Sequence, residues 1–165
     1  MAGLQISGLS KRQQISYLLT VLLLLIGTIA WRLFGTIVVD GESMNPTLKS
    51  GESLMVMRKY KWFPSLAVGD IIVLKPGNAR TDGHAVIKRI VFMQNKTGTA
   101  AWPTSIQTKF GTFTSEELFP AGNEDCDLNR PNGIYVMGDN IDHSEDSRDY
   151  GPVTASDVYG KVLGR

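Results

Sequence analysis

The sequence predicts a mainly β protein, in which one N-terminal transmembrane helix precedes a small domain of the β-sandwich or barrel-like kind. Three observations lead to this fold class. Residues 15–31 form an uncharged apolar run, short apolar or alternating runs follow from Thr36 onward, and Gly, Pro, Asn and Asp separate those runs. With 165 residues, the chain has room for one domain and one anchor.

The N-terminal apolar run is long enough for a membrane anchor. Residues 15–31 carry no charge, and a spanning helix needs roughly 17–25 predominantly apolar residues. Lys11 and Arg12 precede the run, and no acidic residue appears before Asp40. Because positive charge favours the cytoplasmic side of a membrane, the N-terminus is predicted to lie in the cytoplasm. The predicted parts are a cytoplasmic tail at 1–12, a transmembrane anchor at 13–35 and an extracytoplasmic β-rich domain at 36–165.

Two other interpretations of the apolar run stay open. A cleavable signal peptide has a similar layout, with residues 28–30 (Thr-Ile-Ala) as a poor cleavage site. A buried helix of a globular domain is the other alternative, although four consecutive leucines give no amphipathic period. An uncleaved anchor fits the length of the run better than either alternative.

Candidate strands follow the apolar run to the end of the chain. They lie at residues 36–39, 53–58, 70–74, 85–93, 105–113, 134–137 and 158–163. Residues 114–119 predict one helical turn capped by Ser or Thr. The segment 94–132 is the least patterned and predicts a peripheral hairpin or extended loops. Strands at this spacing favour a small sandwich or barrel over a sheet built from βαβ units.

Composition excludes several classes of function. The chain has 17 basic and 16 acidic residues, so no large basic field points to a nucleic-acid partner. Cys126 is the only cysteine, which excludes an intramolecular disulfide and a cysteine-rich metal site. Asp139, Asp142 and Asp146 lack the spacing and terminal glutamate of a calcium loop. We therefore expect neither a metal nor another cofactor.

Ser43 is the first candidate for chemistry. It lies in the run GESMNPTL at residues 41–48. A serine hydroxyl is a poor nucleophile until a nearby base takes its proton. His84 and His143 are the only histidines, and a triad of Ser43, His84 and Asp139 can be assembled on paper. Its chain order matches none of the familiar triads.

Lys88 is the other candidate base. To accept a proton near neutral pH it must be uncharged, so burial has to lower its pKa from about 10.4 toward about 7–8, which corresponds to roughly 4 kcal/mol. Strand alternation puts Lys88 on one face with Val86 and Ile90. The same alternation puts Arg89 among Ile87 and Val91 on the opposite face. Periodicity alone therefore does not choose between the two basic residues.

Four sequence blocks occur in a single order. They are Gly-x-Ser-Met-x-Pro-Thr-Leu at 41–48, Gly-Asp-Ile-Ile-Val-x-Lys-Pro at 69–76, Ile-Lys-Arg-Ile-Val at 87–91 and Gly-Asp-Asn-x-Asp-x-Ser-x-Asp-Ser-Arg at 138–148. With these blocks in this order, the chain resembles the type I signal peptidase family. Members of that family are membrane-anchored serine proteases with a Ser-Lys dyad. The last block, rich in glycine and aspartate, is especially specific.

The resemblance implies roles for the residues that match these blocks. Ser43 would attack the scissile carbonyl, and its backbone amide would donate to the oxyanion. Lys88 would be the general base that later protonates the leaving amine, and Ser144 would hydrogen-bond the lysine amine. The rest of the last block would support the site, through an ion pair and two further polar residues: Asp146 with Arg148, and Asp139 and Asn140.

The match is less complete around the substrate. Val39 and Ile87 match positions that line shallow pockets for small substrate side chains. Some family members carry a serine two positions before the nucleophile, where this chain has Gly41. The Gly-rich continuation after the lysine strand is missing, because residues 92–95 read Phe-Met-Gln-Asn. The missing continuation and the short chain resemble the smaller peptidases that mature pilins in conjugative transfer systems.

The resemblance predicts a membrane-bound serine endopeptidase that removes signal peptides from secreted or translocated precursors. It would be a hydrolase of the cytoplasmic (inner) membrane, with precursors that bear apolar signal segments, membrane lipid, and secretion or conjugation machinery as partners. Trp62 and Phe63 are predicted to dip into the membrane interface. The alternatives are a conjugative-transfer peptidase that matures a pilin subunit, and an inactive precursor-binding scaffold of the same fold. A LexA-like self-cleaving regulator is disfavoured, since no DNA-binding domain or cleavable linker precedes Ser43.

Overall fold

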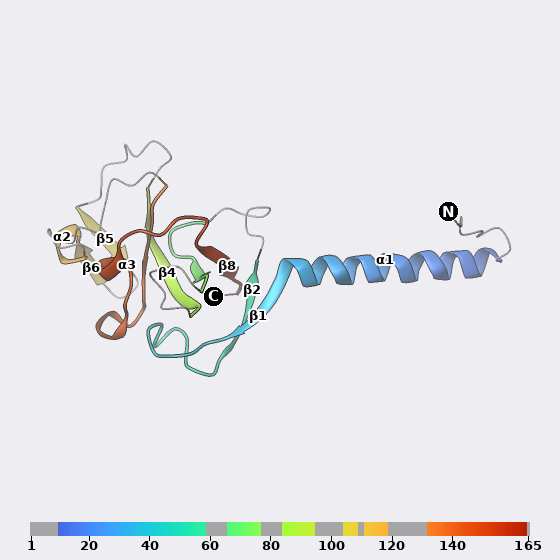
Figure 1. Cartoon of the computed structure of the whole chain (residues 1–165), viewed down its shortest axis with the longest axis horizontal. Helices are drawn as coiled ribbons and strands as arrows, with labels where there is room; N and C mark the ends of the chain where they lie inside the picture. The colour runs from blue at the N-terminus through green and yellow to red at the C-terminus, as the bar shows by residue number, and fades with distance from the viewer. Residues whose placement is uncertain are drawn as a thin grey trace.

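The computed structural model describes residues 10–58, 66–76, 84–94, 104–108, 111–118 and 132–164 (Figure 1). Trp62, Phe63 and Cys126 lie outside these described residues. The elements, in chain order, are α1 (Lys11–Leu33), β1 (Phe34–Val38), β2 (Ser53–Met57), β3 (Ile71–Leu74), β4 (Val86–Met93), β5 (Ser105–Thr108), β6 (Gly111–Thr114), α2 (Ser115–Leu118), β7 (Ile134–Met137), η3 (Ile141–His143), α3 (Ser147–Tyr150) and β8 (Val158–Val162).

Helix α1 projects away from the β-rich domain (Figure 1). Ser10 caps its first turn in a capping box with Gln13. The helix has 23 residues, which corresponds to a length of about 35 Å. None of its residues is buried, and its length and composition are those of a membrane span. The interpretation as a core helix is therefore wrong, because a core helix buries at least one face.

The helix passes directly into the sheet. It ends at Leu33, two residues before the predicted end of the anchor, because Phe34 and Gly35 pair with Met57 and Val56 of β2. The apolar pattern alone predicts that the helix continues to residue 35, but pairing with β2 makes residues 34 and 35 part of a strand. The division into cytoplasmic tail, anchor and extracytoplasmic domain stays a prediction.

Six strands form one antiparallel sheet in the order β1-β2-β8-β3-β4-β7. The mainly β fold preceded by one helix is thus confirmed. Strand β3 is buried on both faces, so its residues divide between two hydrophobic clusters. Ile71 and Val73 belong to one cluster, and Ile72 and Leu74 belong to the other.

Most predicted strands agree with the structure to within two residues, and residues 134–137 agree at both ends. The single strand predicted at 105–113 is wrong. Strands β5 and β6 pair with each other there as an antiparallel hairpin. The chain reverses because Gly111 adopts a φ of +144°, which favours glycine, and the Thr108 hydroxyl donates to the Gly111 carbonyl at 3.1 Å. The hairpin packs on the sheet through Ile106, which lies in a third cluster with Val91 and Tyr135.

The predicted helical turn at 114–119 corresponds to α2. The Thr114 hydroxyl accepts from the Glu117 amide at 3.2 Å, and the Glu117 carboxylate accepts from the Thr114 amide at 2.8 Å. This reciprocal pair satisfies two amides at the start of the turn. The segment 138–148, expected only as a polar loop, contains η3 and the start of α3.

Candidate active site

Ser43 lies on a loop that joins β1 to β2. The base of the loop is closed by two backbone hydrogen bonds, from Val39 to Glu52 at 2.8 Å and from Gly51 to Val39 at 2.9 Å. Met44 and Leu48 are fully buried in the hydrophobic core. The loop is therefore fixed on both sides of its turn, and it presents the partly exposed Ser43 directly before a buried anchor residue.

The backbone before the serine restricts which donors the site can have. Gly41 has a φ of +88°, a conformation that L side chains rarely adopt. A serine at this position would be strained, so a hydroxyl donor at position 41 does not fit this loop. Among the described residues, the backbone N–H of Ser43 donates to no acceptor. That amide is thus available to a bound ligand.

Lys88 is buried on β4, between β3 and β7, and is only 3% exposed. It pairs with Ile72 of β3, and Ile72 and Ile90 on its own face are fully buried. Burial lowers the pKa of the Lys88 amine from its ordinary value of 10.5, while the nearby carboxylates of Asp146 and Glu145 act in the opposite direction. The amine therefore sits in an apolar strand next to an acidic loop.

The structure resolves which basic residue of β4 is buried. Arg89 points to the opposite face, where its Nε and Nη2 donate to the two Asp139 oxygens at 2.8 and 2.7 Å. Its Nη1 donates to the Gly69 carbonyl at 2.7 Å. The guanidinium joins the turn before β3 to the segment after β7, and it leaves Lys88 as the buried amine.

The segment after β7 is organised around Asp146, which is completely buried. Its Oδ1 accepts from the Nε and backbone amide of Arg148 at 2.9 and 3.2 Å. Its Oδ2 accepts from the Gly138 amide, the Ser144 hydroxyl and the Arg148 Nη2 at 2.9, 2.9 and 3.0 Å. The hydrogen bonds to Asp146 raise the pKa of the Arg148 guanidinium, so that group stays charged.

Gly138 is the point where the three candidate segments meet. The register of β4 and β7 pairs Arg89 with Met137. Continued by one residue, this antiparallel register places Lys88 beside Gly138. A Cβ on Gly138 would lie 2.1 Å from the Ser144 Oγ and 2.5 Å from the Ser43 carbonyl oxygen. The serine loop, the lysine strand and Ser144 therefore converge on one residue that has no side chain.

We expect Gly138→Ala to damage this convergence. The added methyl would overlap the Ser144 side chain and the Ser43 carbonyl, so at least one must move. The free energy of unfolding should fall by about 1–3 kcal/mol, as for other overpacked sites, and peptidase activity should fall with it. Chemical denaturation and precursor cleavage measure the two effects. Gly27→Ala is the control, because its methyl meets no atom within 4 Å, and an unchanged Gly138→Ala variant would contradict the convergence.

Asn140 joins the serine loop to the last block directly. Its backbone amide donates to the Ser43 carbonyl at 2.9 Å, and its Nδ2 donates to the Glu42 carbonyl at 3.1 Å. These two bonds fix the peptide groups on either side of the Ser43 Cα. The position of Ser43 thus depends on a residue almost one hundred positions later in the chain.

The histidine alternatives receive no support from these contacts. His84 and His143 are both exposed. Both Asp139 oxygens accept from Arg89, which is a role in holding the loop rather than in orienting a histidine. Within the part of the chain that the structure describes, no group of three His, Cys, Asp or Glu side chains could hold a metal ion.

Val39 and Ile87 lie in the same core cluster. They are only 4% and 9% exposed, so as the floor of a substrate pocket they would present a small apolar area. Their role stays a prediction.

Sequence reasoning missed several structural contributors. The Arg89–Asp139 ion pair, the central position of Gly138 and the buried Ser147, whose hydroxyl accepts from the Val136 amide at 2.9 Å, were not expected. Asp149 accepts from the Asp146 amide at 2.9 Å and completes a capping box. The pattern Asp146-x-x-Asp149 is a capping signal visible in the sequence, whereas the partners of Arg89 and Gly138 depend on strand order.

Comparisons with known proteins identify the family of the chain. A family model described as signal peptidase, peptidase S26, matches residues 12–94 and 106–165. Such a match defines a membrane serine peptidase that processes precursor proteins. The chain belongs to this signal peptidase family.

Three relatives illustrate the range of similarity. Mitochondrial inner membrane protease subunit 1 of Schizosaccharomyces pombe is 34% identical over 136 residues, which cover 81% of this chain and 73% of that protein. The probable signal peptidase I-1 of Synechocystis is 31% identical over 135 residues, or 77% of this chain and 68% of that protein. Signal peptidase I U of Bacillus subtilis is 25% identical over 167 residues, covering 92% and 88%.

Proposed function

We propose that this chain is a membrane-bound serine endopeptidase that removes signal peptides with a dyad of Ser43 and Lys88. The observation that carries the proposal is the burial of the Lys88 amine on a strand that runs beside Gly138, where the Ser43 loop and Ser144 meet. A lysine in such a place loses its charge more readily than one in water, as a general base must.

In the proposed reaction, the neutral Lys88 amine takes the proton of the Ser43 hydroxyl as Oγ attacks the scissile carbonyl. The oxyanion that forms accepts a hydrogen bond from the Ser43 backbone amide. The Lys88 ammonium then gives its proton to the leaving amine, and the C–N bond breaks to leave an acyl-enzyme. Lys88 next takes a proton from water, which attacks the ester, and it returns that proton to Ser43 when the acid leaves.

Ser144 acts as a positioning residue in this scheme. Its hydroxyl proton is donated to the Asp146 Oδ2 at 2.9 Å. Since a hydroxyl has one proton, Ser144 can only accept a hydrogen bond from the Lys88 amine. When Ser144 accepts one N–H of the Lys88 amine, the nitrogen lone pair points away from Ser144. It then faces the space beside Gly138 that the Ser43 loop borders. The ion pair of Asp146 and Arg148 holds the Ser144 hydroxyl in that orientation.

The anchor explains how modest substrate contacts suffice. A precursor whose apolar signal segment lies in the same bilayer has a raised local concentration near the enzyme. With Lys11 and Arg12 before α1, the catalytic domain would lie on the outer side of the cytoplasmic membrane. Val39 and Ile87 would then select a small residue before the cleaved bond, in an Ala-x-Ala-like context.

Precursor cleavage by the purified full chain in lipid vesicles tests the proposal. The substrates are a secretory precursor and a pilin precursor, because the sequence predicts both classes, and mass spectrometry locates the cut. We expect one cut directly after a small residue that follows the apolar segment. Binding of either precursor without any cut would identify an inactive scaffold and would contradict the proposal.

The pH dependence of cleavage has a defined sign. Only the neutral amine accepts the serine proton, so the cleavage rate should rise with pH through the Lys88 pKa. This rising limb of the pH–rate profile should have its midpoint below pH 10.5. Glu145 raises that pKa by its negative charge. Glu145→Gln should therefore move the limb to lower pH, while Asp142→Asn, the exposed control in the same loop, should leave it in place. Movement of the limb to higher pH in Glu145→Gln would contradict this electrostatic account.

The free energy of unfolding should also depend on pH through the Lys88 pKa. The folded chain binds the Lys88 proton less tightly than the unfolded chain does. Its free energy of unfolding should therefore rise with pH between the lowered pKa and 10.5. Lys88→Met removes the titrating group and should remove this contribution.

A further inference from the structure

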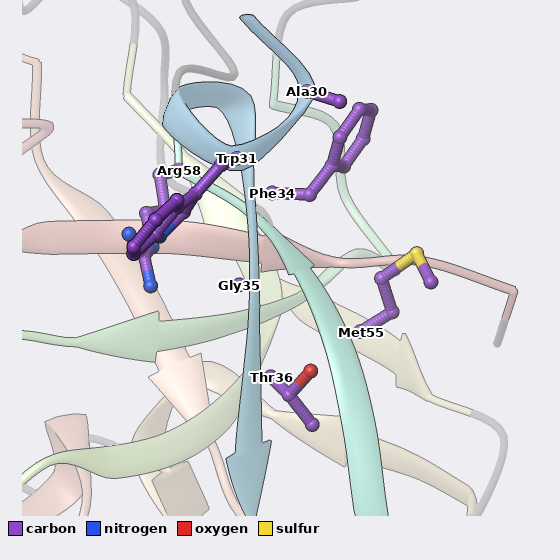
Figure 2. A pocket seen from close by; sticks show the side chains of 7 residues that line it. All are labelled: Ala30, Trp31, Phe34, Gly35, Thr36, Met55 and Arg58. Atoms are coloured by element: carbon purple, nitrogen blue, oxygen red, sulfur yellow. The ribbon is translucent and has the colours of Figure 1, made fainter. Parts of the chain in front are cut away.

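A second candidate site lies where α1 meets the sheet. An open cleft of about 310 Å³ is lined by Ala30, Trp31, Phe34, Gly35, Thr36, Met55 and Arg58 (Figure 2). In this view Trp31 and Arg58 lie on one side of the β1 ribbon, and Phe34 and Met55 lie on the other. None of the residues of the candidate active site lines this cleft, so the two sites are separate.

Among the described residues, Arg58 is the only charged one that lines the cleft. Its backbone amide donates to the Leu33 carbonyl at 2.8 Å, which fixes Arg58 to the end of α1. Its Nε is buried and has no hydrogen-bond partner among the described residues. The guanidinium carbon lies 5.8 Å from the centre of the Tyr159 ring. A buried N–H on a charged group that lacks an acceptor is costly. Because the Nε is enclosed by the protein, an acceptor from outside the chain would bind the terminal nitrogens of the guanidinium.

The guanidinium of Arg58 packs directly against Gly35. A Cβ at this position would lie 2.5 Å from both the Nε and the Nη2 of Arg58. Gly35 is not among the glycines with positive φ, so its backbone does not itself require glycine. The absence of a side chain instead allows the guanidinium to approach the β1 backbone closely.

The position of the cleft indicates what would occupy it. The uncharged run of α1 ends at Trp31, and β1 begins three residues later. Trp31 is 76% exposed, as an aromatic side chain at a membrane interface would be. If α1 spans a bilayer, Arg58 lies at the depth of the lipid headgroups. A guanidinium presents N–H donors in a planar fork that matches phosphate oxygens.

We propose that this cleft binds the phosphate of an anionic membrane phospholipid, with Arg58 as the donor. Trp31, Phe34 and Met55 would contact the glycerol and upper acyl region of the same lipid. A bound headgroup would fix the depth at which β1 leaves the membrane, and thereby the height of the Ser43 loop above it. The inference rests on α1 spanning the membrane, as in the proposed function, but it does not require an active peptidase.

Native mass spectrometry of the full chain tests this site. The protein is released from detergent micelles that contain equal amounts of phosphatidylglycerol and phosphatidylcholine, and the retained lipid is identified. Wild type should retain one phosphatidylglycerol about fivefold more often than phosphatidylcholine, given the attraction of one basic residue for an anionic headgroup. Arg58→Gln should lose this preference, and Arg58→Lys, which keeps the charge without the planar fork, should retain part of it.

Arg32→Gln is the matched control, because it removes the same charge from the end of α1 without lining the cleft. It should keep the preference. Equal loss in Arg32→Gln and Arg58→Gln would show general charge attraction and would overturn the inference, as would an unchanged Arg58→Gln. Displacement of the lipid by soluble glycerol phosphate would identify a site for free phosphate and would also overturn it.

Two further readouts separate this inference from the proposed function. Extraction of the wild-type chain from vesicles by alkaline carbonate would overturn both the lipid site and the anchor. Absence of precursor cleavage together with retained lipid preference would overturn the peptidase proposal alone.

Discussion

Ser43→Ala and Lys88→Met should each lower the rate of precursor cleavage by on the order of 10⁴–10⁶-fold, to the limit of detection. The first variant removes the attacking oxygen. The second removes the only buried amine of β4 and keeps an unbranched side chain of similar length in the apolar strand. In the proposed dyad the two residues act as one unit, so the double variant should be no slower than either single variant. Cleavage of one precursor under single-turnover conditions measures all three.

The controls for this prediction are chosen from the same chain. His84→Ala and His143→Ala alter exposed side chains and should cleave at the wild-type rate. Lys88→Arg keeps a positive charge that cannot be removed at neutral pH, so it should be as inactive as Lys88→Met. Loss of activity in the histidine variants with retention in Lys88→Met would refute the dyad.

Asp146→Asn should have the largest effect on stability. The carboxylate is completely buried and accepts five hydrogen bonds, three of them from Arg148. Asparagine keeps the shape but removes the charge, so the guanidinium of Arg148 loses its charged partner and an amide N–H₂ faces other donors. Breaking one side of a buried ion pair costs about 3–5 kcal/mol. Urea denaturation of the full chain in detergent, followed by tryptophan fluorescence, should show this decrease in the free energy of unfolding.

Asp142→Asn is the control for this experiment. Asp142 is exposed in η3 of the same segment, and a substitution there should change the free energy of unfolding by no more than about 0.5 kcal/mol. Cleavage by Asp146→Asn should also fall under conditions where the variant remains folded, because Ser144 loses the acceptor for its hydroxyl proton. Wild-type stability in Asp146→Asn would contradict the central place given to this carboxylate.

The sequence was sufficient for much of the fold because local patterns were strong. The strand at 134–137 is a short apolar run bounded by Gly133 and Gly138, and both of its ends were predicted. The hairpin of β5 and β6 was missed, since the apolar pattern of 105–113 continues through the turn and only Gly111 marks the reversal. A single glycine within a run of strand-forming residues is a weak signal.

The choice between Lys88 and Arg89 needed the structure. The sheet is buried on both faces, so alternation assigned apolar neighbours to each residue. The order of the strands determines which of the two basic residues belongs to the candidate site. It brings Asp139 and Gly69 to Arg89, and it brings Gly138 beside Lys88. Such partners lie 50 and 20 residues away from Arg89 in the chain. The four blocks identified the candidate residues, and tertiary pairing determines which of them can act together.

Titration of the Lys88 amine in the intact chain tests this account most directly. Lysines labelled with ¹³C at the ε carbon are followed by NMR across the alkaline range, and Lys88→Arg assigns the resonance that disappears. The account predicts that this resonance titrates below 10.5, with the same midpoint as the rising limb of the cleavage rate. The account would be contradicted if the Lys88 amine titrated at or above 10.5 while the cleavage rate of the wild type already reached its maximum at neutral pH.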